Sequence, residues 1–535
     1  MMEIPERRLD YSAPYASARS PVFGRNVVAT SQSLASAAGV EMLMAGGNAV
    51  DAAVAAAMTL TVVEPTGCGI GSDAFAIVWD GAALHGLNAS GCSPAGWTAA
   101  RFGAEPVPER GWNSVTVPGA VSAWVALLKR FGLLSLSQVA APAIRHARHG
   151  YAVTPRIAEL WRRNAAVLSE QPGFADCFLP NGRAPRAGEI FRSEAHARTL
   201  ELTADSDGEA FYRGALARAI AEDARRHGAA LTLDDLGAHE PAWVTTLSQP
   251  YAGALVHELP PNGQGLATLM SLGVLQALGE RGASADDPRE THLAIEATKL
   301  ALADIYHFVG DPSSMTAAPE ALLDSAYLAN RARLIDRDRA GEFGHGAPKA
   351  GGTVYLSAAD ASGMMISFIQ SNYMGFGSGV VVPGTGISLQ NRGAGFSTAP
   401  GHPNQVGPRK RPFHTIIPGF VMDGDGSPLM AFGLMGGPMQ AQGHLQLLLR
   451  ILGHGQNPQT AADAARWRVL AGKRVAVEAT MSSVLIEALR SRGHEIVIEP
   501  PDSVFAFGGA QIVMRTEGGY VAGSDPRKDG QAIGY

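Results

Sequence analysis

The chain has 535 residues, of which 46% are hydrophobic and 17% are charged, a composition typical of a well-buried globular protein and not of a disordered one. Its formal net charge of −6 at pH 7 gives no electrostatic reason to expect nucleic acid or an anionic membrane as a partner. The three cysteines, Cys68, Cys92 and Cys177, are odd in number and scattered. We therefore expect buried free thiols instead of a disulfide framework or a zinc knuckle.

The N-terminal segment, MMEIPERRLDYSAPYASARS, carries charges but lacks the apolar core of a secretory signal. The most apolar stretch of the chain, residues 49–63, contains Asp51 and is too short and too polar to span a bilayer. These features predict a cytoplasmic protein with no membrane partner.

Residues 33–63 favour two packed alanine-rich helices, with a break at Gly46, Gly47 and Asn48. A glycine loop, GCGIG at 67–71, then leads into a strand. Further helices are expected at 119–150, at 156–168, in pieces over 193–227, at 289–308, near 440–453 and near 480–492. Between about 350 and 440 the glycines become dense and short strand-like runs dominate, and strands close the chain.

Residues 339–352, RAGEFGHGAPKAGG, are glycine-rich and polar, which is typical of a flexible connector. A strand can begin directly behind this connector, at Thr353, with alternate residues facing opposite ways. Gly351 and Gly352 stand immediately before its first residue. Glycine at such a position usually marks a bend or a close approach of two backbones.

The strand from Thr353 is predicted to form a hairpin with the run MMISFIQS at 364–371, because DASG at 360–363 has turn chemistry. A hairpin centred on Ser362 places Thr353 directly opposite Ser371, with Cβ atoms about 4.5–5.5 Å apart. A stabilising cross-strand pair of hydroxyls is one interpretation. The connector and its glycines favour another, in which Thr353 is a nucleophile that Ser371 supports.

A threonine that becomes N-terminal carries both a nucleophilic hydroxyl and a base, its free α-amine. Because Gly352 has no side chain, its own carbonyl group is sterically open to attack by the Thr353 hydroxyl. An N→O acyl shift followed by hydrolysis of the ester would cut the chain between Gly352 and Thr353. The sequence therefore predicts a large subunit of residues 1–352 and a small subunit of residues 353–535.

The glycine-rich stretches do not match a nucleotide-binding fingerprint. Residues 374–397, MGFGSGVVVPGTGISLQNRGAGFS, hold seven glycines, but those of GFGSG recur at every second residue and lead into VVVPG instead of a helix. We therefore predict no cofactor and no metal. The pair Gly436 and Gly437 differs, because two successive unhindered N–H groups can stabilise an oxyanion.

A series of motifs in this order resembles the γ-glutamyltransferase family of N-terminal nucleophile hydrolases: GGNAVDAAVAAAMTLTVVEP, GCGIGSDAF, SVTVPGAVSAW, PPNGQGLATL, EATKLALAD, TVYLSAADASG, GFGSGVVVPGTGISLQN, GPRKRP, LMGGPMQAQ and GSDPRKDGQAIGY. The resemblance implies an α+β fold with four αββα layers and a precursor that cuts itself into a large and a small subunit. It also implies that Thr353 is the self-cleavage residue and nucleophile. Ser371 stands where the family has a supporting threonine, and Gly436 and Gly437 match its oxyanion-hole glycines.

The substrate end of the family's site is changed in this chain. The family arginine that holds the α-carboxylate of a γ-glutamyl group would fall near Ser90, where no arginine is present. Two consecutive serines of the family fall on His414 and Thr415, and an asparagine falls on Tyr373. The family's residues that bind the substrate α-carboxylate are therefore not preserved in this chain.

Arg392 stands where the family has a Glu or Gln that contacts the substrate α-amine, and Gly395 stands where an Asp pairs with that amine. Loss of the acid and gain of an arginine reverse the local charge, so a substrate ammonium group is no longer favoured. Arginines more often make structural ion pairs, and His414 could equally be a packed histidine. The place of Arg392 in the glycine loop favours a binding role. The predicted substrate-binding positions are Arg392, Tyr373, Asn391, His414 and Thr415.

The leading interpretation is a self-processing amidohydrolase that acts through an acyl-threonine on a small carboxylated amide, such as oxamate or a glutaryl-type amide. The changed positions resemble the branch of the family that includes oxamate amidohydrolase and cephalosporin-acylase-like proteins. One alternative is a γ-glutamyltransferase or glutathione hydrolase with a rebuilt pocket, and another is an inactive binding paralogue. The expected partners are the amide substrate and the two subunits of one precursor, and homo-oligomerisation stays open.

Overall fold

The structure is a computed structural model that describes residues 18–343 and 352–535. Most of the predicted connector, residues 344–351, therefore lies outside the described residues. No helix within the described ranges is both long and apolar enough to cross a membrane.

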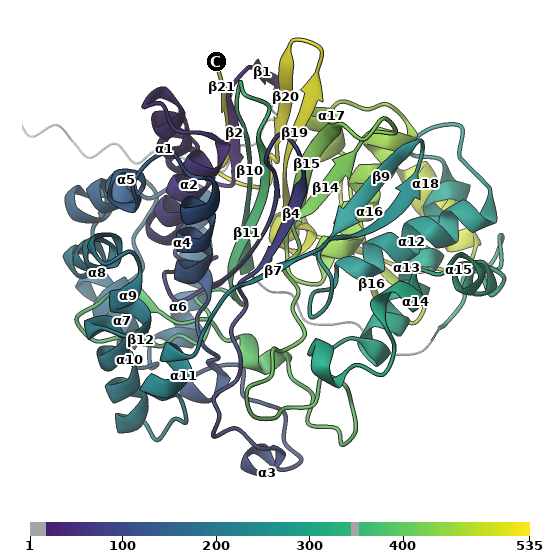
Figure 1. Ribbon diagram of the computed structural model, residues 1–535. Coiled ribbons are helices and arrows are strands. Elements are labelled where there is room, and N and C mark those ends of the chain that lie inside the picture. The colour runs from purple at the N-terminus through teal and green to yellow at the C-terminus, as the bar shows by residue number, and fades with distance from the viewer. Residues whose placement is uncertain (1–17, 344–351) are drawn as a thin grey trace, which may run out of the picture.

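Two seven-stranded antiparallel sheets pack face to face at the centre of the molecule (Figure 1). The first sheet has the spatial order β21 (Gln531–Gly534), β2 (Val27–Thr30), β10 (Gly352–Ala359), β11 (Met365–Tyr373), β3 (Asp73–Trp79), β4 (Leu84–Asn88) and β7 (Ala242–Val244). The second sheet has the order β1 (Val22–Gly24), β20 (Gly519–Ser524), β19 (Gly509–Thr516), β15 (Pro428–Met435), β14 (Gly419–Met422), β9 (Ala254–Glu258) and β8 (Leu247–Tyr251).

Helices cover the outer face of each sheet, so the chain forms four αββα layers (Figure 1). The layer on the first sheet contains α1 (Ser33–Met44), α2 (Ala49–Val63), α4 (Ala120–Phe131), α5 (Leu136–His149), α6 (Pro155–Leu168), α7 (Phe174–Phe178), α8 (Glu194–Asp205), α9 (Glu209–Tyr212), α10 (Ala215–Arg226) and α11 (Leu233–Gly237). The layer on the second sheet contains α12 (Gly265–Leu278), α13 (Pro288–Phe308), α14 (Pro319–Leu322), α15 (Ser325–Ala332), α16 (Met439–Leu448), α17 (Pro458–Asp463) and α18 (Ser483–Ser491). The predicted α+β fold with four layers is confirmed.

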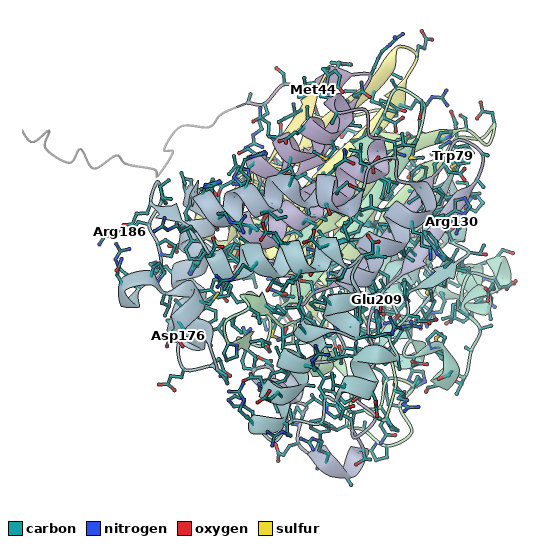
Figure 2. The ribbon with its side chains drawn as sticks, turned by 60° about the vertical axis from the view of Figure 1, so that its left-hand side comes forward. Met44, Trp79, Arg130, Asp176, Arg186 and Glu209 are labelled. Atoms are coloured by element: carbon teal, nitrogen blue, oxygen red, sulfur yellow. The ribbon has the colours of Figure 1, made fainter. Side chains whose placement is uncertain are left out.

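Several smaller elements complete the chain. They are α3 (Ala99–Phe102), the pair β5 (Tyr151–Ala152) and β6 (Ile190–Phe191), the pair β12 (Val381–Val382) and β13 (Ile387–Ser388), and a three-stranded sheet of β16 (Trp467–Ala471), β17 (Arg474–Glu478) and β18 (Glu495–Glu499). Figure 2 brings the helices over the first sheet forward, where exposed charged side chains such as Asp176, Arg186 and Glu209 cover their outer surface.

Helix α2 lies at the centre of the first helical layer, and all 15 of its residues are buried. Its small side chains let the neighbouring helix and the sheet approach closely. Asn48 begins the helix by accepting hydrogen bonds from the N–H groups of Val50 and Asp51, while the Asp51 carboxylate accepts one from the Asn48 N–H. The predicted pair of helices with a break at Gly46–Asn48 is confirmed.

Strands β10 and β11 form the predicted hairpin at the centre of the first sheet. Tyr355 pairs with Ile369 and Leu356 with Phe368, which is the register of a hairpin centred on Ser362. A bulge at the open end pairs Gly352 with Tyr373. The side chain of Tyr355 faces the second sheet, whereas that of Leu356 packs against the helices.

The segments before and after residue 352 are interleaved in both sheets. In the first sheet, β10 pairs with β2 and β11 pairs with β3, so two strands of the predicted small subunit lie between strands of the large one. In the second sheet, β14 pairs with β9 and β20 pairs with β1. Neither predicted subunit therefore builds a sheet without the other.

Some local details differ from expectation. The three cysteines are free, but only Cys68 is fully buried, whereas Cys92 and Cys177 are half-buried. The helix expected near 440–453 is α-helical to Leu448 and continues as a π-helix over Leu449–Gly453. The helix expected over 119–150 is two helices, because Gly132 ends α4 and Ser135 caps α5.

Candidate active site

Thr353 and Ser371 lie side by side at the bulged end of the hairpin. The distance between Thr353 Oγ1 and Ser371 Oγ is 3.1 Å, and both side chains are buried. Ser371 Oγ also accepts a hydrogen bond of 2.8 Å from the N–H of Tyr373. That bond fixes the orientation of the Ser371 hydroxyl beside the threonine oxygen.

A second side chain, Gln440 of α16, reaches Thr353 from the opposite helical layer. Its Nε2 lies 3.4 Å from Thr353 Oγ1, and its Oε1 accepts a 3.0 Å hydrogen bond from the Ile417 N–H. Because Oε1 is engaged, the amide group of Gln440 presents its donor end to the threonine. Sequence reasoning missed Gln440, although it lies three residues after the glycine pair.

Gly436 and Gly437 form the turn between β15 and α16. Their φ angles are +123° and +59°, a region that residues with a Cβ rarely adopt. Neither N–H donates a hydrogen bond to another described residue. Gln264 holds the turn by donating from Nε2 to the carbonyl oxygens of Gly437 and Thr415. The N-terminal end of α16 thus offers two N–H groups to an anion.

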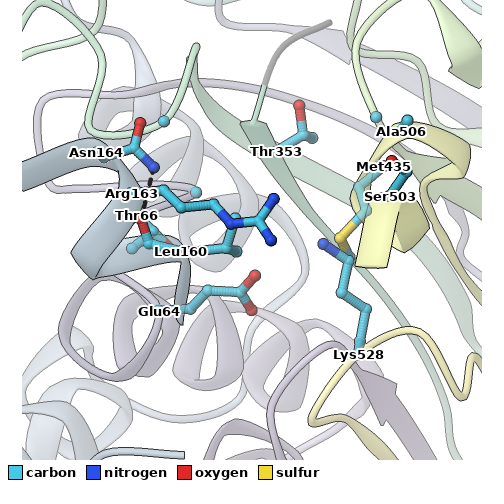
Figure 3. Close-up of a pocket in the computed structure, with 13 residues that line it drawn as sticks. Glu64, Thr66, Leu160, Arg163, Asn164, Thr353, Met435, Ser503, Ala506 and Lys528 are labelled. Carbon is cyan, nitrogen blue, oxygen red and sulfur yellow. Dashed lines mark hydrogen bonds between the residues drawn. The ribbon is translucent and has the colours of Figure 1, made fainter. Parts of the chain in front are cut away.

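A cavity of about 290 Å³ contains both Thr353 and Gly436 (Figure 3). Three charged residues also line it: Glu64 at the end of α2, Arg163 of α6 and Lys528 from the loop after β20. Sequence reasoning did not select these three residues. Glu64 and Lys528 belong to motifs that carried the family resemblance, but no local pattern marks them as cavity residues.

Glu64 and Lys528 influence each other's ionisation within this cavity. Burial raises the pKa of Glu64 to about 7, and the positive charge of Lys528 opposes that rise. The Ser31 hydroxyl donates a 2.5 Å hydrogen bond to Glu64 Oε2. Burial lowers the pKa of Lys528, and the charge of Glu64 opposes that change. The net charge of the cavity therefore changes near neutral pH.

Arg392 is completely buried and lies against the ring of Tyr373, with its guanidinium carbon 4.1 Å from the ring centre. Nη1 donates a 2.9 Å hydrogen bond to Thr415 Oγ1. Nε and Nη2 have no hydrogen-bond partner among the described residues. Burial lowers the pKa of Arg392 to about 10, which leaves it protonated at neutral pH. A buried cation with two unused donors is a suitable partner for an anion.

His414 lies in the same region but is held by the protein. Its Nε2 is 3.1 Å from Asp73 Oδ2, and both side chains are fully buried. Burial, assisted by the charge of Arg392, lowers the pKa of His414 well below its ordinary value. Burial raises the pKa of Asp73 to about 7, against the opposing charge of Arg392. This pair fits the packed, hydrogen-bonded histidine left open by the sequence.

The other predicted substrate-binding residues divide between two places. Asn391 braces the loop, because its side chain accepts a hydrogen bond from the Met374 N–H and donates one to the Glu109 carbonyl. Tyr373 and Thr415 line a second cavity, of about 440 Å³, whose walls include aromatic side chains. The aromatic residues other than Tyr373 are Tyr306, Phe396 and Phe413.

Hydrogen bonds link the walls of the two cavities through the residues that hold Thr353. Tyr373 lines the second cavity and donates its N–H to Ser371, which contacts Thr353. On the other side, Gln264 bonds the carbonyls of Thr415 and Gly437. Arg392 contacts Tyr373 and Thr415, two wall residues of the second cavity, but is itself fully buried and lines neither cavity in this structure.

The sequence matches the family described as Gamma-glutamyltranspeptidase over residues 35–535. The chain belongs to this family. It is 35% identical to the oxamate amidohydrolase proenzyme of Klebsiella pneumoniae, over 94% of this chain and 97% of that protein. It is also 35% identical to the glutathione hydrolase-like YwrD proenzyme of Bacillus subtilis, over 96% of this chain and 99% of that protein.

A solved structure, the cephalosporin acylase of Bacillus halodurans, superposes with a TM-score of 0.93 at 46% identity and covers 100% of this chain and 99% of that one. This γ-glutamyltranspeptidase-family protein is therefore an N-terminal nucleophile hydrolase in fold and class. Family membership and the paired hydroxyls at Thr353 argue against the inactive binding paralogue.

The described residues of this family member include one buried cluster with metal-ligand side chains: His292, Glu296 and His494, whose ligand atoms lie within 4.8 Å of one another. Hydrogen bonds already join the cluster to itself and to its neighbours, although His494 Nδ1 has no partner among the described residues. His292 Nδ1 lies 2.7 Å from His494 Nε2, and Glu296 Oε1 accepts a 2.7 Å hydrogen bond from Lys299. These contacts are those of a buried polar network between α13 and the turn after α18.

Proposed function

We propose that this protein is a self-processing amidohydrolase that cuts itself between Gly352 and Thr353 and then hydrolyses a small carboxylated amide. The observation that carries the proposal is the environment of the Thr353 hydroxyl. It lies directly after a glycine, contacts Ser371 and Gln440, and shares a cavity with the Gly436–Gly437 turn.

Self-cleavage would begin with attack of Thr353 Oγ1 on the Gly352 carbonyl carbon. The peptide C–N bond breaks, the nitrogen takes the hydroxyl proton, and an ester joins Gly352 to the threonine oxygen. Water then hydrolyses the ester and leaves a carboxylate on Gly352 and a free α-amine on Thr353. Chains of residues 1–352 and 353–535 result.

In the processed enzyme, the α-amine of Thr353 would take the proton from its own hydroxyl as the oxygen attacks the substrate carbonyl. The N–H groups of Gly436 and Gly437 would hold the oxyanion. The amine passes the proton to the leaving nitrogen, the C–N bond breaks, and an acyl-threonine forms. Attack by water releases the acid and restores the hydroxyl.

The substrate class follows from the groups beyond the nucleophile. Two buried donor nitrogens of Arg392, Nε and Nη2, have no hydrogen-bond partner among the described residues, and a substrate carboxylate would supply a negative charge and acceptors. The cavity lined by Tyr373 and Thr415 gives room for the acyl group beside it. The names of two relatives, an oxamate amidohydrolase and a cephalosporin acylase, support an amide substrate other than a γ-glutamyl compound.

Glutathione hydrolysis is the second candidate, supported by the name of the Bacillus subtilis relative. The local charge argues against it. A γ-glutamyl group carries an α-ammonium, and the buried cation Arg392 stands at the position that the resemblance assigns to its contact. An ammonium beside the positive charge of this guanidinium would be repelled.

A mass measurement and a substrate screen test the proposal together. The purified protein should give two masses, for residues 1–352 and 353–535, and Thr353→Ala should give one. The processed protein should release product from oxamate or a glutaryl anilide faster than from γ-glutamyl-p-nitroanilide. An uncut but active chain would refute the mechanism, and a clear preference for the γ-glutamyl compound would restore glutathione hydrolysis.

A further inference from the structure

The Thr353 cavity contains more charge than the reaction described above uses. Lys528 extends into it from one side, Arg163 from the other, and the Glu64 carboxylate lies below (Figure 3). Lys528 is partly buried, whereas Arg163 is exposed. A partly buried charge is screened less by water and salt than an exposed one, so Lys528 has the larger influence on the cavity.

The α-amine created at Thr353 has to be unprotonated to act as a base. An ordinary α-amine has a pKa of about 7.7–8.0 and is therefore mostly protonated at pH 7. A neighbouring cation disfavours the protonated amine, and a neighbouring anion favours it. The groups that share the cavity with Thr353 therefore determine how much of the enzyme is competent at neutral pH.

We propose that Lys528 holds the new α-amine of Thr353 in its neutral, basic form, and that Glu64 counters this effect when it is ionised. Both residues are positioning residues: they line the cavity beside Thr353 and act on its amine through their charge. The proposal rests on the cleavage at Thr353 proposed above, and it adds a function for two residues that the reaction itself leaves unused.

Glu64 does not cancel Lys528 over the whole pH range. Burial raises the pKa of Glu64 to about 7, so below neutrality the carboxyl is largely neutral and no longer opposes the positive charge of Lys528. The Ser31 hydroxyl also bonds to the Glu64 carboxyl. Glu64 therefore offsets the charge of Lys528 least in the pH range where an ordinary α-amine would be protonated.

Among the described residues, the charged neighbours come from several elements, and on α6 Arg163 is held in an ion pair with Glu159, with Nε 2.6 Å from Oε1. From α2 and the loop after it, Cys68 is close to Glu64, and its own pKa is raised well above its ordinary value, so it stays neutral. Around Lys528, the charges of Asp525 and Asp529 raise its pKa and that of Arg156 lowers it. From α16 and β11, the groups that reach Thr353 are the uncharged Gln440 and Ser371.

The wild-type protein permits a direct test that needs no substrate. The processed protein is treated with short pulses of acetic anhydride between pH 5.5 and 9.5, and acetylation of the Thr353 α-amine is followed by mass spectrometry. A free peptide, TVYLSAAD, gives the reference. We expect the pKa of the Thr353 amine to lie about one unit below that of the peptide. An equal or higher value overturns the proposal.

Two variants should shift this value in opposite directions. Lys528→Met should raise the pKa of the α-amine by about one unit, and Glu64→Gln should lower it. The acidic limb of the kcat/KM profile should move by the same amounts. Lys129→Met is the matched control, because Lys129 is exposed at the end of α4 and lines no part of the Thr353 cavity.

The outcomes separate this proposal from the proposed function. Equal shifts in Lys528→Met and Lys129→Met, or no shift in Glu64→Gln, would overturn the role of the cavity charges while leaving the hydrolase mechanism intact. A protein that stays as one uncut chain would refute the proposed cleavage, and this inference with it. If Lys528→Met alone fails to cut itself, the wild type and Glu64→Gln still decide the matter.

Discussion

The contact between Thr353 and Ser371 was predicted from the local sequence, and it also fits the chemistry of a nucleophile and its supporting hydroxyl. Two hydroxyls 3.1 Å apart are common between neighbouring strands. Here the pair is buried, and the Tyr373 N–H and the Gln440 amide group fix its surroundings. A nucleophile needs its hydroxyl held in such a fixed orientation, whereas an ordinary cross-strand pair does not.

Ser371→Ala should therefore lower turnover by roughly 10–1000-fold while the protein stays folded, because one hydrogen bond to a reacting group is lost. Ser371→Thr should restore much of the rate, since it keeps the hydroxyl. Steady-state kinetics on the processed proteins gives the comparison, with circular dichroism as the check on folding. An unchanged rate in Ser371→Ala would show that the pair is only structural.

Arg392 is the second residue whose role can be measured directly. Arg392→Ala should raise KM for a carboxylated amide by roughly 10–100-fold, if a charge-assisted hydrogen bond of about 1.5–3 kcal/mol is lost. The KM of Arg392→Lys should lie between those of the wild type and Arg392→Ala, because lysine keeps the charge but not the two parallel donors. Self-cleavage of each variant reports that the fold is intact. Equal KM values in all three proteins would remove Arg392 from the substrate site.

At the scale of elements, the glycine loop before β3 approaches the nucleophile strand unusually closely. A Cβ on Gly67 would lie 2.9 Å from Val354 Cγ1 and 3.2 Å from the Thr353 carbonyl oxygen. The glycine spacing in this loop, which does not match a nucleotide fingerprint, is therefore explained at this position by contact between two backbones. The loop supports β10 from the side of the helices.

Gly67→Ala should displace β10, slow self-cleavage and cost about 1–3 kcal/mol of stability, as overpacking in a core does. Gly518→Ala is the matched control, because a Cβ there would have no neighbour within 4 Å. Gel assays of processing over time and urea unfolding of both variants provide the two readouts. Identical behaviour of the two variants would contradict this account of the loop.

At the scale of the whole molecule, the interleaving of strands determines what processing does to the assembly. Strand β10 lies between β2 and β11, and β11 lies between β10 and β3. A cut before Thr353 would therefore divide the chain without exposing a sheet face, because every shared edge stays hydrogen-bonded. The cores between and outside the sheets also draw residues from both sides of residue 352.

The processed protein should consequently elute from a sizing column as a unit that contains both chains in equal amount, with 55.8 kDa per pair. Two bands should appear only under denaturing conditions. Urea should release both chains in a single transition, because neither can complete its sheet alone. Elution of the separate chains in native buffer would contradict the interleaved arrangement. A mass of two or more pairs would establish a homo-oligomer.

The sequence by itself determined the features that depend on near neighbours along the chain. Alternation of side chains and a turn at 360–363 were enough to predict the register of β10 and β11, since a hairpin's pairing follows from its turn. The break between α1 and α2 followed in the same way from Gly46, Gly47 and Asn48. The positive φ angles of Gly436 and Gly437 agree with the glycine pair that the sequence singled out.

Only the tertiary structure decided what surrounds the nucleophile. Gln440 contacts Thr353, and Glu64, Arg163 and Lys528 line its cavity, all from elements far apart in the chain. No sequence periodicity indicates which distant segments will pack together. The complete burial of Arg392 and the hydrogen bond between His414 and Asp73 could likewise not be predicted from the sequence. Burial and ionisation depend on all neighbours in space, whereas a sequence pattern reports only neighbours along the chain.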